Sequence, residues 1–376
     1  MKRREFMRLV GGAAAWPLAA GAQPATSVPK PTAAETAAMA ELAAAFMEKY
    51  AAPALSVAVG YGGAIVYRDA FGFSDRENRT AATPENLFRI ASVTKTITSV
   101  AIFSLVEAGR IRLADKVFGP GAITGADYGR PPLNPGIEDI TVEHLLTHTA
   151  GGWHNDRNDP MFKNPQMSQA ELIAWTLRTR PLDHPPGENF AYSNFGFCVL
   201  GRVIEKITRQ TYANYVRAAV LTPCGVTDMA IAGNTLAARR PGEVKYYGHG
   251  DNPYGLNVAR MDSHGGWIAR PADLAQFFMH VDGFATPPNI LRPKTLDTMT
   301  TASAANPHYA KGWEVNAAHN WWHNGSLAGA TTIAVRTHSG FCWAGFTNTR
   351  RTPSDIGIDL DRLIWTMVRE VKAWRA

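Results

Sequence analysis

The chain has 376 residues, enough for one large domain or two ordinary ones, and 45% of them are apolar, as in a protein with a buried core. Its 38 basic and 32 acidic residues leave a net charge of +6, and part of this surplus lies within the first eight residues. Because the surplus is small and scattered, with no basic run interleaved with aromatic residues, it argues against a nucleic-acid-binding protein.

The first residues predict an export signal. Arg3-Arg4 precedes an apolar run over 9–20, and Ala20-Gly21-Ala22 is typical of a small-residue cleavage site. The run is too short to span a membrane. We therefore expect 1–22 to be a twin-arginine signal peptide that engages the twin-arginine export machinery, giving a periplasmic or secreted product without a stable membrane anchor. The cysteines lie far apart among apolar neighbours, and we expect buried thiols: Cys198, Cys224 and Cys342.

Periodicity then predicts the elements in chain order. The N-terminal part favours a helix over 32–50 and a hairpin of strands 54–60 and 64–71. The dense apolar positions of 88–107 predict a helix that is buried on most sides, with Gly109 as its C-cap. The sequence further predicts helices over 141–148, 168–179, 195–208, 212–221, 271–280 and 356–374, and strands over 311–315, 321–322, 331–337 and 341–347.

This order predicts two domains built from three stretches of chain. Residues 31–85 and 290–376 would form one α/β domain, and 86–289 a mostly helical domain inserted into it. A cleft between two such domains is the natural place for a site.

Ser92 and Lys95 lie three residues apart at the head of the helix predicted for 88–107, so their side chains share one face. A serine hydroxyl is a weak nucleophile until a base removes its proton, and a lysine kept neutral by burial or by a neighbouring cation can do this. The pair is a candidate nucleophile and base. A helix-capping hydroxyl beside a solvated charge is the structural alternative.

Two more stretches carry polar groups that suit a site. Tyr192-Ser193-Asn194 ends a loop before a predicted helix, where Tyr192 could relay protons if cations lower its pKa and Asn194 could orient Lys95 or a substrate amide. His323-Asn324-Gly325 lies on a predicted edge strand, whose glycine permits close approach of a ligand or another backbone. We expect a substrate along this edge, with His323 at its polar end; a solvent-facing histidine is the alternative.

Ser92-Val-Thr-Lys95, Tyr192-Ser-Asn194 and His323-Asn-Gly325, in this order, resemble the three motifs of serine β-lactamases and penicillin-binding proteins. The chain is most similar to the group of class C β-lactamases, D-alanyl-D-alanine carboxypeptidases and esterases, and Leu145–Gly151 and Gly265-Gly266 also resemble that group. The resemblance implies an α/β (α+β) fold, in which N- and C-terminal helices flank an antiparallel sheet with an inserted mostly helical domain.

The resemblance also implies a function and roles. The protein would be a serine hydrolase that forms an acyl-enzyme on an amide, ester or β-lactam carbonyl of a small molecule or peptide, without metal or cofactor. Ser92 would attack the carbonyl, Lys95 and Tyr192 would share the proton transfers, and Asn194 would support them. The backbone N–H groups of Ser92 and Ser326 would form the oxyanion hole.

The third motif would bind substrate through His323, Asn324 and Gly325, but it departs from the Lys-Thr-Gly that is usual in true β-lactamases. Because a histidine is mostly neutral at pH 7, it attracts a substrate carboxylate less strongly than a lysine does. This weakens the case for efficient β-lactam hydrolysis and leaves esters and D-amino-acid peptides open.

Two rival functions remain open from the sequence. A penicillin sensor that is acylated but turns over slowly would carry the same three motifs. A metal-dependent hydrolase would use His144 and His148, which are four residues apart, with His154, Asp156 and Asp159 nearby, but no His-Glu pair supplies the general base of that class.

Overall fold

A computed structural model describes residues 28–156, 159–351 and 355–374. The predicted signal peptide over 1–22 lies outside the described residues and stays a prediction. Within the described ranges, none of the helices combines the length and the apolar character that crossing a membrane requires.

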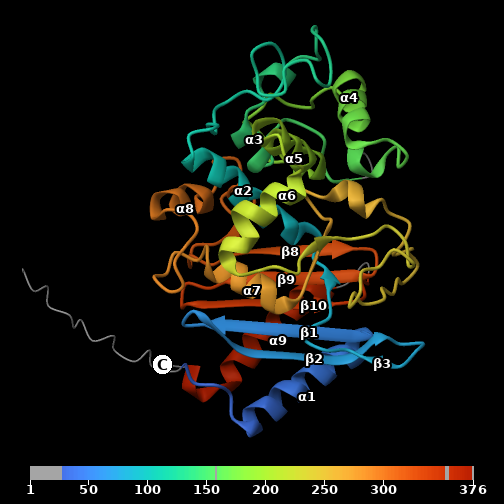
Figure 1. The fold of residues 1–376 in the computed structure, drawn as a ribbon, viewed down its shortest axis with the longest axis vertical. Helices are drawn as coiled ribbons and strands as arrows, with labels where there is room; N and C mark the ends of the chain where they lie inside the picture. Colours follow the sequence, from blue (N-terminus) through green and yellow to red (C-terminus); the bar gives the residue numbers. More distant parts are fainter. Residues whose placement is uncertain (1–27, 157–158, 352–354, 375–376) are drawn as a thin grey trace, which may run out of the picture.

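A seven-stranded antiparallel sheet joins the two ends of the described chain (Figure 1). Its strands are β1 (Ala54–Tyr61), β2 (Ala64–Asp75), β3 (Thr80–Ala81), β7 (Glu314–Val315), β8 (Trp321–Leu327), β9 (Ala330–Arg336) and β10 (Phe341–Thr347), in the order β3-β2-β1-β10-β9-β8-β7. The N-terminal hairpin meets the C-terminal strands where β1 pairs with β10, with Val57 opposite Gly345.

Helices cover both faces of this sheet. α1 (Ala33–Tyr50) and α9 (Ile356–Glu370) share one hydrophobic core with the alternate β1 residues Val57 and Val59. α7 (Pro271–Met279) packs on β1 and β10, and the sulfur of Met279 lies beside Gly60. Strands buried on both faces require apolar residues at nearly every position, which explains the continuous apolar run of β1.

The remaining helices gather beyond the β8 side of the sheet (Figure 1). They are α2 (Thr94–Glu107), α3 (Val142–Leu146), α4 (Gln169–Thr179), α5 (Asn194–Thr208), α6 (Tyr212–Val216) and α8 (Pro293–Thr300). α2 is their centre: it is buried over most of its length and contacts α5, α6 and α8. The expected fold class is confirmed. The division into two domains stays a prediction; α7 packs on the sheet although its residues fall inside 86–289.

The structure differs from the predicted elements where segments are short. Phe88–Arg89 is a strand (β4) rather than the start of a helix, and it pairs with β6 (Trp267–Ala269), which also pairs with β5 (Ala230–Ile231). Strands of two or three residues are too short to show a period of two. α8 was not predicted, β7 is shorter than 311–315, and β8 continues beyond the predicted 321–322 to Leu327.

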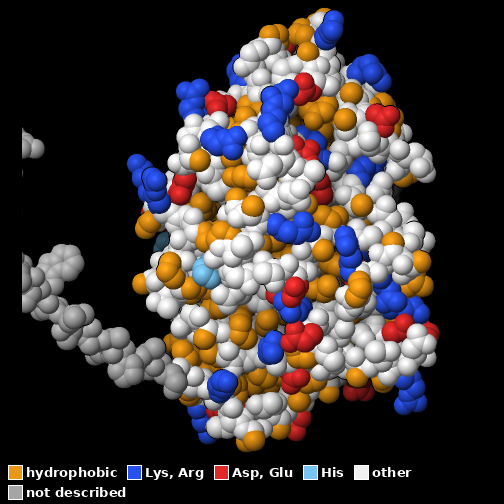
Figure 2. All heavy atoms as spheres, viewed as in Figure 1, with side chains coloured by type: hydrophobic (Ala, Val, Ile, Leu, Met, Phe, Trp, Pro, Cys, Tyr) orange, Lys and Arg blue, Asp and Glu red, His pale blue; other side chains and the backbone are white. Residues whose placement is uncertain are grey.

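Charged side chains are mixed over the visible surface. Figure 2 shows Lys and Arg among Asp, Glu and apolar side chains on the face in view. This distribution agrees with the scattered charge of the sequence.

Candidate active site

Ser92 lies on a tight turn directly before α2. Ala91–Val93 form a single 3₁₀ turn, and Ala91 adopts the left-handed backbone conformation, with φ of 47°. This conformation is costly for a residue with a side chain and concentrates at functional sites. The turn leaves Ser92 partly exposed, whereas Lys95, in the first turn of α2, is fully buried.

The amine of Lys95 has three hydrogen-bond partners. Its Nζ lies 3.1 Å from Ser92 Oγ, 2.7 Å from Asn194 Oδ1 and 3.1 Å from the carbonyl oxygen of His264. A neutral amine donates two hydrogens and keeps one lone pair. Because the two carbonyl oxygens accept only, they take the two N–H groups and leave the lone pair for the hydroxyl of Ser92. Burial lowers the pKa of Lys95 to about 7, so the neutral form is well populated at neutral pH.

Tyr192 completes the immediate surroundings of this amine. Its ring centre lies 4.7 Å from Lys95 Nζ, and its hydroxyl interacts with Ser92. Burial raises the pKa of Tyr192 well above its ordinary value, and the contact with Ser92 offsets only part of that rise. The condition under which Tyr192 could relay protons, a pKa lowered by neighbouring cations, is therefore not met. At neutral pH Tyr192 is a phenol that can donate a proton, while Lys95 is the stronger candidate base.

Asn194 begins α5 and connects Lys95 to two further polar groups. Its Oδ1 accepts from Lys95, and its Nδ2 donates to Asn155 Oδ1 at 2.9 Å and to Asp159 Oδ2 at 3.0 Å. Ser193 caps the helix by accepting a hydrogen bond from the backbone of Gly196, which holds this end of α5 in place. The expected contact of Asn194 with Lys95 is present.

The third motif brings β8 against the turn that carries Ser92. A Cβ at Gly325 would overlap the carbonyl oxygen of Ile90 and Thr332 Oγ1, and it would lie 3.1 Å from Ala91 Cβ. Only glycine permits this approach. One residue further, Ser326 lines the same cavity as Ser92. The geometry thus places the backbone of β8 beside the turn that carries Ser92.

The imidazole of His323 is fully buried, which contradicts the solvent-facing alternative. Its Nε2 lies 3.1 Å from Tyr309 Oη, which lies 3.1 Å from His148 Nε2, and its Nδ1 lies 2.6 Å from the carbonyl oxygen of Asn324. His148 Nδ1 accepts a hydrogen bond from the Ser193 N–H, so the proton of this neutral ring is on Nε2. His148 Nε2–H therefore donates to Tyr309 Oη, and the Tyr309 O–H donates to Nε2 of a neutral His323. Burial lowers the pKa of His323 to about 3.

This series of hydrogen bonds corrects the expectation for the third motif. Both ring nitrogens of His323 are used inside the protein, so its imidazole does not lie where we expected the polar end of a substrate. The side chain of Asn324 is exposed and, by the alternation of a strand, faces away from His323. Gly325 packs against Ala91, and Ser326, the residue after the motif, lines the same cavity as Ser92.

A cavity of about 550 Å³ opens in front of Ser92. Apolar side chains form part of its wall: Phe162, Leu256, Met261 and Leu327. Phe162 is 43% exposed, which is unusual for a large apolar side chain. Asp251 and Arg350 form an ion pair at the polar part of the wall. The cavity can therefore hold an apolar group next to Ser92.

The residues considered for a metal site have other partners. His144 completes a capping box at α3, His148 is hydrogen-bonded to Tyr309, and His154 lies 3.7 Å from Asp156. Asp159 faces Asn194. Over the described ranges, three or more His, Cys, Asp or Glu side chains do not come together in a way that could hold a metal ion.

Several residues of the site were not predicted to belong to it, among them Asn155, Tyr309, Asp251 and Arg350. Asp159 was considered only as a metal ligand. The segment Leu145–Gly151 carried a signal, since it contains His148, but nothing in the sequence links it to Tyr309, which comes from a loop more than 150 residues away.

The fold and the site define a class: an antiparallel sheet with a helical region and a Ser-x-x-Lys pair facing a Tyr-x-Asn loop and a glycine-bearing strand. The comparison with known families agrees, because residues 39–363 match the family model for Beta-lactamase. The chain belongs to the Beta-lactamase family, whose members include serine hydrolases and penicillin-binding proteins.

Relatives of known sequence match part of this chain. Protein flp of Staphylococcus aureus (strain MRSA252) is 27% identical over 188 residues, which are 50% of this chain and 36% of flp. Penicillin-binding protein 4* of Bacillus subtilis (strain 168) is 26% identical over 202 residues, which are 52% of this chain and 41% of that protein. The matched part thus spans well under half the length of these relatives.

Solved structures share the fold over most of the chain. The D-amino acid amidase from Ochrobactrum anthropi SV3, complexed with L-phenylalanine amide, gives a TM-score of 0.74 at 20% identity and covers 91% of this chain and 100% of that chain. The octameric penicillin-binding protein homologue from Pyrococcus abyssi gives a TM-score of 0.70 at 24% identity, covering 89% and 79%.

Proposed function

We propose that this protein is a serine hydrolase that cleaves an ester or amide through an acyl-enzyme on Ser92. The observation that carries the proposal is the set of contacts at Lys95 Nζ, which lies within 3.1 Å of Ser92 Oγ and of two carbonyl oxygens. In the neutral amine, the two carbonyl oxygens take the two N–H groups, which leaves the lone pair for the serine hydroxyl. A base of pKa about 7 in contact with the nucleophile is suited to work near neutral pH.

The reaction follows from these positions. Ser92 Oγ attacks the carbonyl carbon while its proton moves to Lys95, and the oxyanion that forms faces the backbone N–H groups of Ser92 and Ser326, each worth about 3 kcal/mol. The proton then passes to the leaving group, from Lys95 or through the phenol of Tyr192, and the bond to the leaving group breaks. Water attacks the ester on Ser92, a proton returns to Oγ, and the acid is released.

The cavity favours substrates with an apolar group and no obligatory carboxylate. The imidazole of His323 is neutral and shielded by Tyr309, so the third motif supplies no cation for a carboxylate. Phe162 and Met261 offer an apolar wall near Ser92. Amides and esters of apolar amino acids fit this description, and the structural likeness to a D-amino acid amidase supports testing the D-forms first.

Replacement of the nucleophile tests the proposal. Ser92→Ala should lower the hydrolysis of a nitrophenyl butyrate by about 10³-fold or more, because no hydroxyl remains to be acylated. Ser104→Ala is the matched control: it removes a hydroxyl from the same helix, where Ser104 binds Ala101 O and Tyr215, and should leave the rate within about twofold. Activity within tenfold of the wild type in Ser92→Ala would exclude the mechanism.

A substrate panel separates the proposal from the penicillin sensor. It compares the nitrophenyl butyrate, D- and L-phenylalanine amide, a D-alanyl-D-alanine peptide and a chromogenic cephalosporin. We expect turnover of the ester or the amides to exceed that of the cephalosporin. A labelled penicillin that forms a stable adduct on Ser92, with no turnover of any ester or amide, would favour the sensor instead.

A further inference from the structure

Asp159 is a buried carboxyl group for which the proposed reaction has no direct use. It has no solvent-exposed surface, and it precedes the 3₁₀ turn Pro160–Phe162. Its Oδ1 accepts from the backbone N–H of Met161 at 2.8 Å, and its Oδ2 accepts from Asn194 Nδ2 at 3.0 Å. Burial raises the pKa of Asp159 to about 6, so the group is largely ionised at neutral pH. A buried carboxylate needs a reason to be retained.

The imidazole, phenol and thiol groups around this carboxylate and Lys95 are uncharged at neutral pH, whereas the carboxyl of Glu314, whose pKa is raised by burial, acts on Tyr192. Burial keeps three imidazoles neutral, those of His148, His264 and His323. The same effect keeps Tyr192 a phenol and raises the pKa of the Cys198 thiol to about 12. More distant cations face other partners: Arg202 pairs with Asp262 and Glu205, and Arg260 donates to backbone carbonyls. Among the described residues, Asp159 is the carboxylate whose charge raises the pKa of Lys95.

We propose that Asp159 is a positioning residue that acts through Asn194, fixing the orientation of its amide and holding a negative charge one hydrogen-bonded residue away from Lys95. The proposal rests on the proposed function, because it concerns the base that activates Ser92.

The orientation follows from donors and acceptors. An ionised carboxylate only accepts hydrogen bonds, so it requires the NH₂ side of the Asn194 amide to face it. Asn155 Oδ1 requires the same side. The oxygen of the amide is thereby directed at Lys95, where it takes one N–H and helps to leave the lone pair for Ser92. A reversed amide would present N–H groups to the amine and compete for that lone pair.

The charge has a second effect. Burial alone lowers the pKa of Lys95, whereas a nearby negative charge raises it. Without the charge, Lys95 would lose its proton at a lower pH and would also be a weaker base. The acid limb of the pH profile should then move to lower pH while the plateau rate falls. A purely structural role would lower the rate without moving the limb.

The rate at which an alkyl fluorophosphonate labels Ser92 reports the protonation state of Lys95 without requiring turnover. In this reaction Ser92 Oγ forms a bond to phosphorus, fluoride leaves, and Lys95 takes the proton. For Asp159→Asn and Asp159→Ser we expect the acid limb of the labelling rate to move down by about one pH unit. The serine variant keeps a hydroxyl that can accept from Asn194 and avoids the opposed NH₂ groups of the asparagine variant.

Two further variants serve as controls. Asp159→Glu keeps the charge and should keep the limb near its wild-type position, even where the rate falls. Asp139→Asn removes a carboxylate that is 67% exposed and paired with Lys116, and should change neither limb nor rate. Thermal unfolding would show whether the variants are folded. If Asp159→Asn and Asp159→Ser are folded and the acid limb of their labelling rate does not move, the inference is overturned. A wild-type enzyme that is not labelled at Ser92 would overturn the proposed function instead.

Discussion

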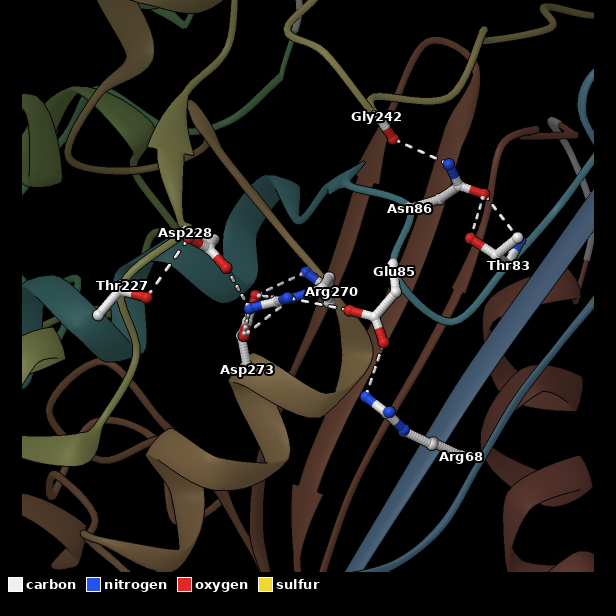
Figure 3. Close-up of polar contacts among 9 residues, drawn as sticks. All are labelled: Arg68, Thr83, Glu85, Asn86, Thr227, Asp228, Gly242, Arg270 and Asp273. Carbon is white, nitrogen blue, oxygen red and sulfur yellow. Dashed lines mark hydrogen bonds and ion pairs between the residues drawn. The ribbon is translucent and has the colours of Figure 1, made fainter.

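Two clusters of charged side chains in this protein are built in opposite ways. In the Arg270 network, shown in Figure 3, the guanidinium of Arg270 meets three carboxylates: Asp273 at 2.9 Å, Glu85 at 3.0 Å and Asp228 at 2.7 Å. Glu85 also forms an ion pair with Arg68 at 2.8 Å. At the head of α2, by contrast, the amine of Lys95 faces neutral oxygens, and its carboxylate Asp159 acts across Asn194.

The difference shows how surroundings decide what a cation does. Hydrogen bonds to Asp273 raise the pKa of Arg270, which remains a permanent charge that links α7 to the loops before β4 and before β5. Burial without direct carboxylate contact lowers the pKa of Lys95 to about 7, which makes it a base. We therefore expect changes in the Arg270 network to alter stability and changes around Lys95 to alter activity.

The largest effect should come from removing the base. Lys95→Met keeps most of the apolar stem of the side chain but cannot accept the proton of Ser92, so the rate of ester hydrolysis should fall by about 10³-fold or more. Lys116→Met, which removes an exposed amine paired with Asp139, should retain the wild-type rate. Thermal unfolding would show that both variants are folded. A Lys95→Met enzyme within tenfold of the wild type would remove the distinction between the two clusters.

A smaller but still large effect is expected at Gly325. Gly325→Ala would push β8 away from Ile90 and Ala91, because the added Cβ overlaps the Ile90 carbonyl oxygen. A displacement of about 1 Å at the oxyanion hole should lower kcat by about 10²-fold. Gly357→Ala is the control, since a Cβ there meets only Thr331 Cγ2 at an ordinary 3.8 Å. Equal kcat values for the two variants would contradict the close approach of β8.

The Arg270 network should respond in the opposite manner. Arg270→Met leaves Asp273, whose side chain is only 7% exposed, without its cation, and should lower the free energy of unfolding by about 1–3 kcal/mol. The activity of the folded enzyme should stay within about twofold. Arg68→Met breaks only an exposed pair and should cost less than about 0.5 kcal/mol. Denaturant unfolding measures both; a loss of activity without a loss of stability in Arg270→Met would count against the comparison.

Sequence reasoning succeeded where the signal was local. The helix at α1, the β1–β2 hairpin and the long helices α5 and α9 follow from apolar spacing, and the helix predicted over 168–179 is present as α4, with Ser168 as its N-cap. Ser92 and Lys95 could be paired because they lie one helical turn apart. The fold class came from the resemblance of three motifs.

The remaining features depend on the folded chain. An alanine in the sequence does not indicate that Ala91 adopts a positive φ, which is why the helix begins at Thr94 rather than at Phe88 as predicted. Two sets of hydrogen bonds join segments that are far apart in sequence. One connects Asp159 with Asn194, and the other connects His148 through Tyr309 to His323. The sequence showed a histidine in the third motif, but only the folded structure shows that its ring is buried and that both nitrogens bond within the protein.

The pH dependence of kcat/KM for the nitrophenyl ester in the wild-type enzyme tests the central claim most directly. The base must be neutral to accept the proton of Ser92, so kcat/KM should fall below a pH of about 7, as Lys95 becomes protonated, and reach a plateau above it. A profile that is flat from about pH 5 to 9, or that rises as the pH falls, would contradict a catalytic role for neutral Lys95.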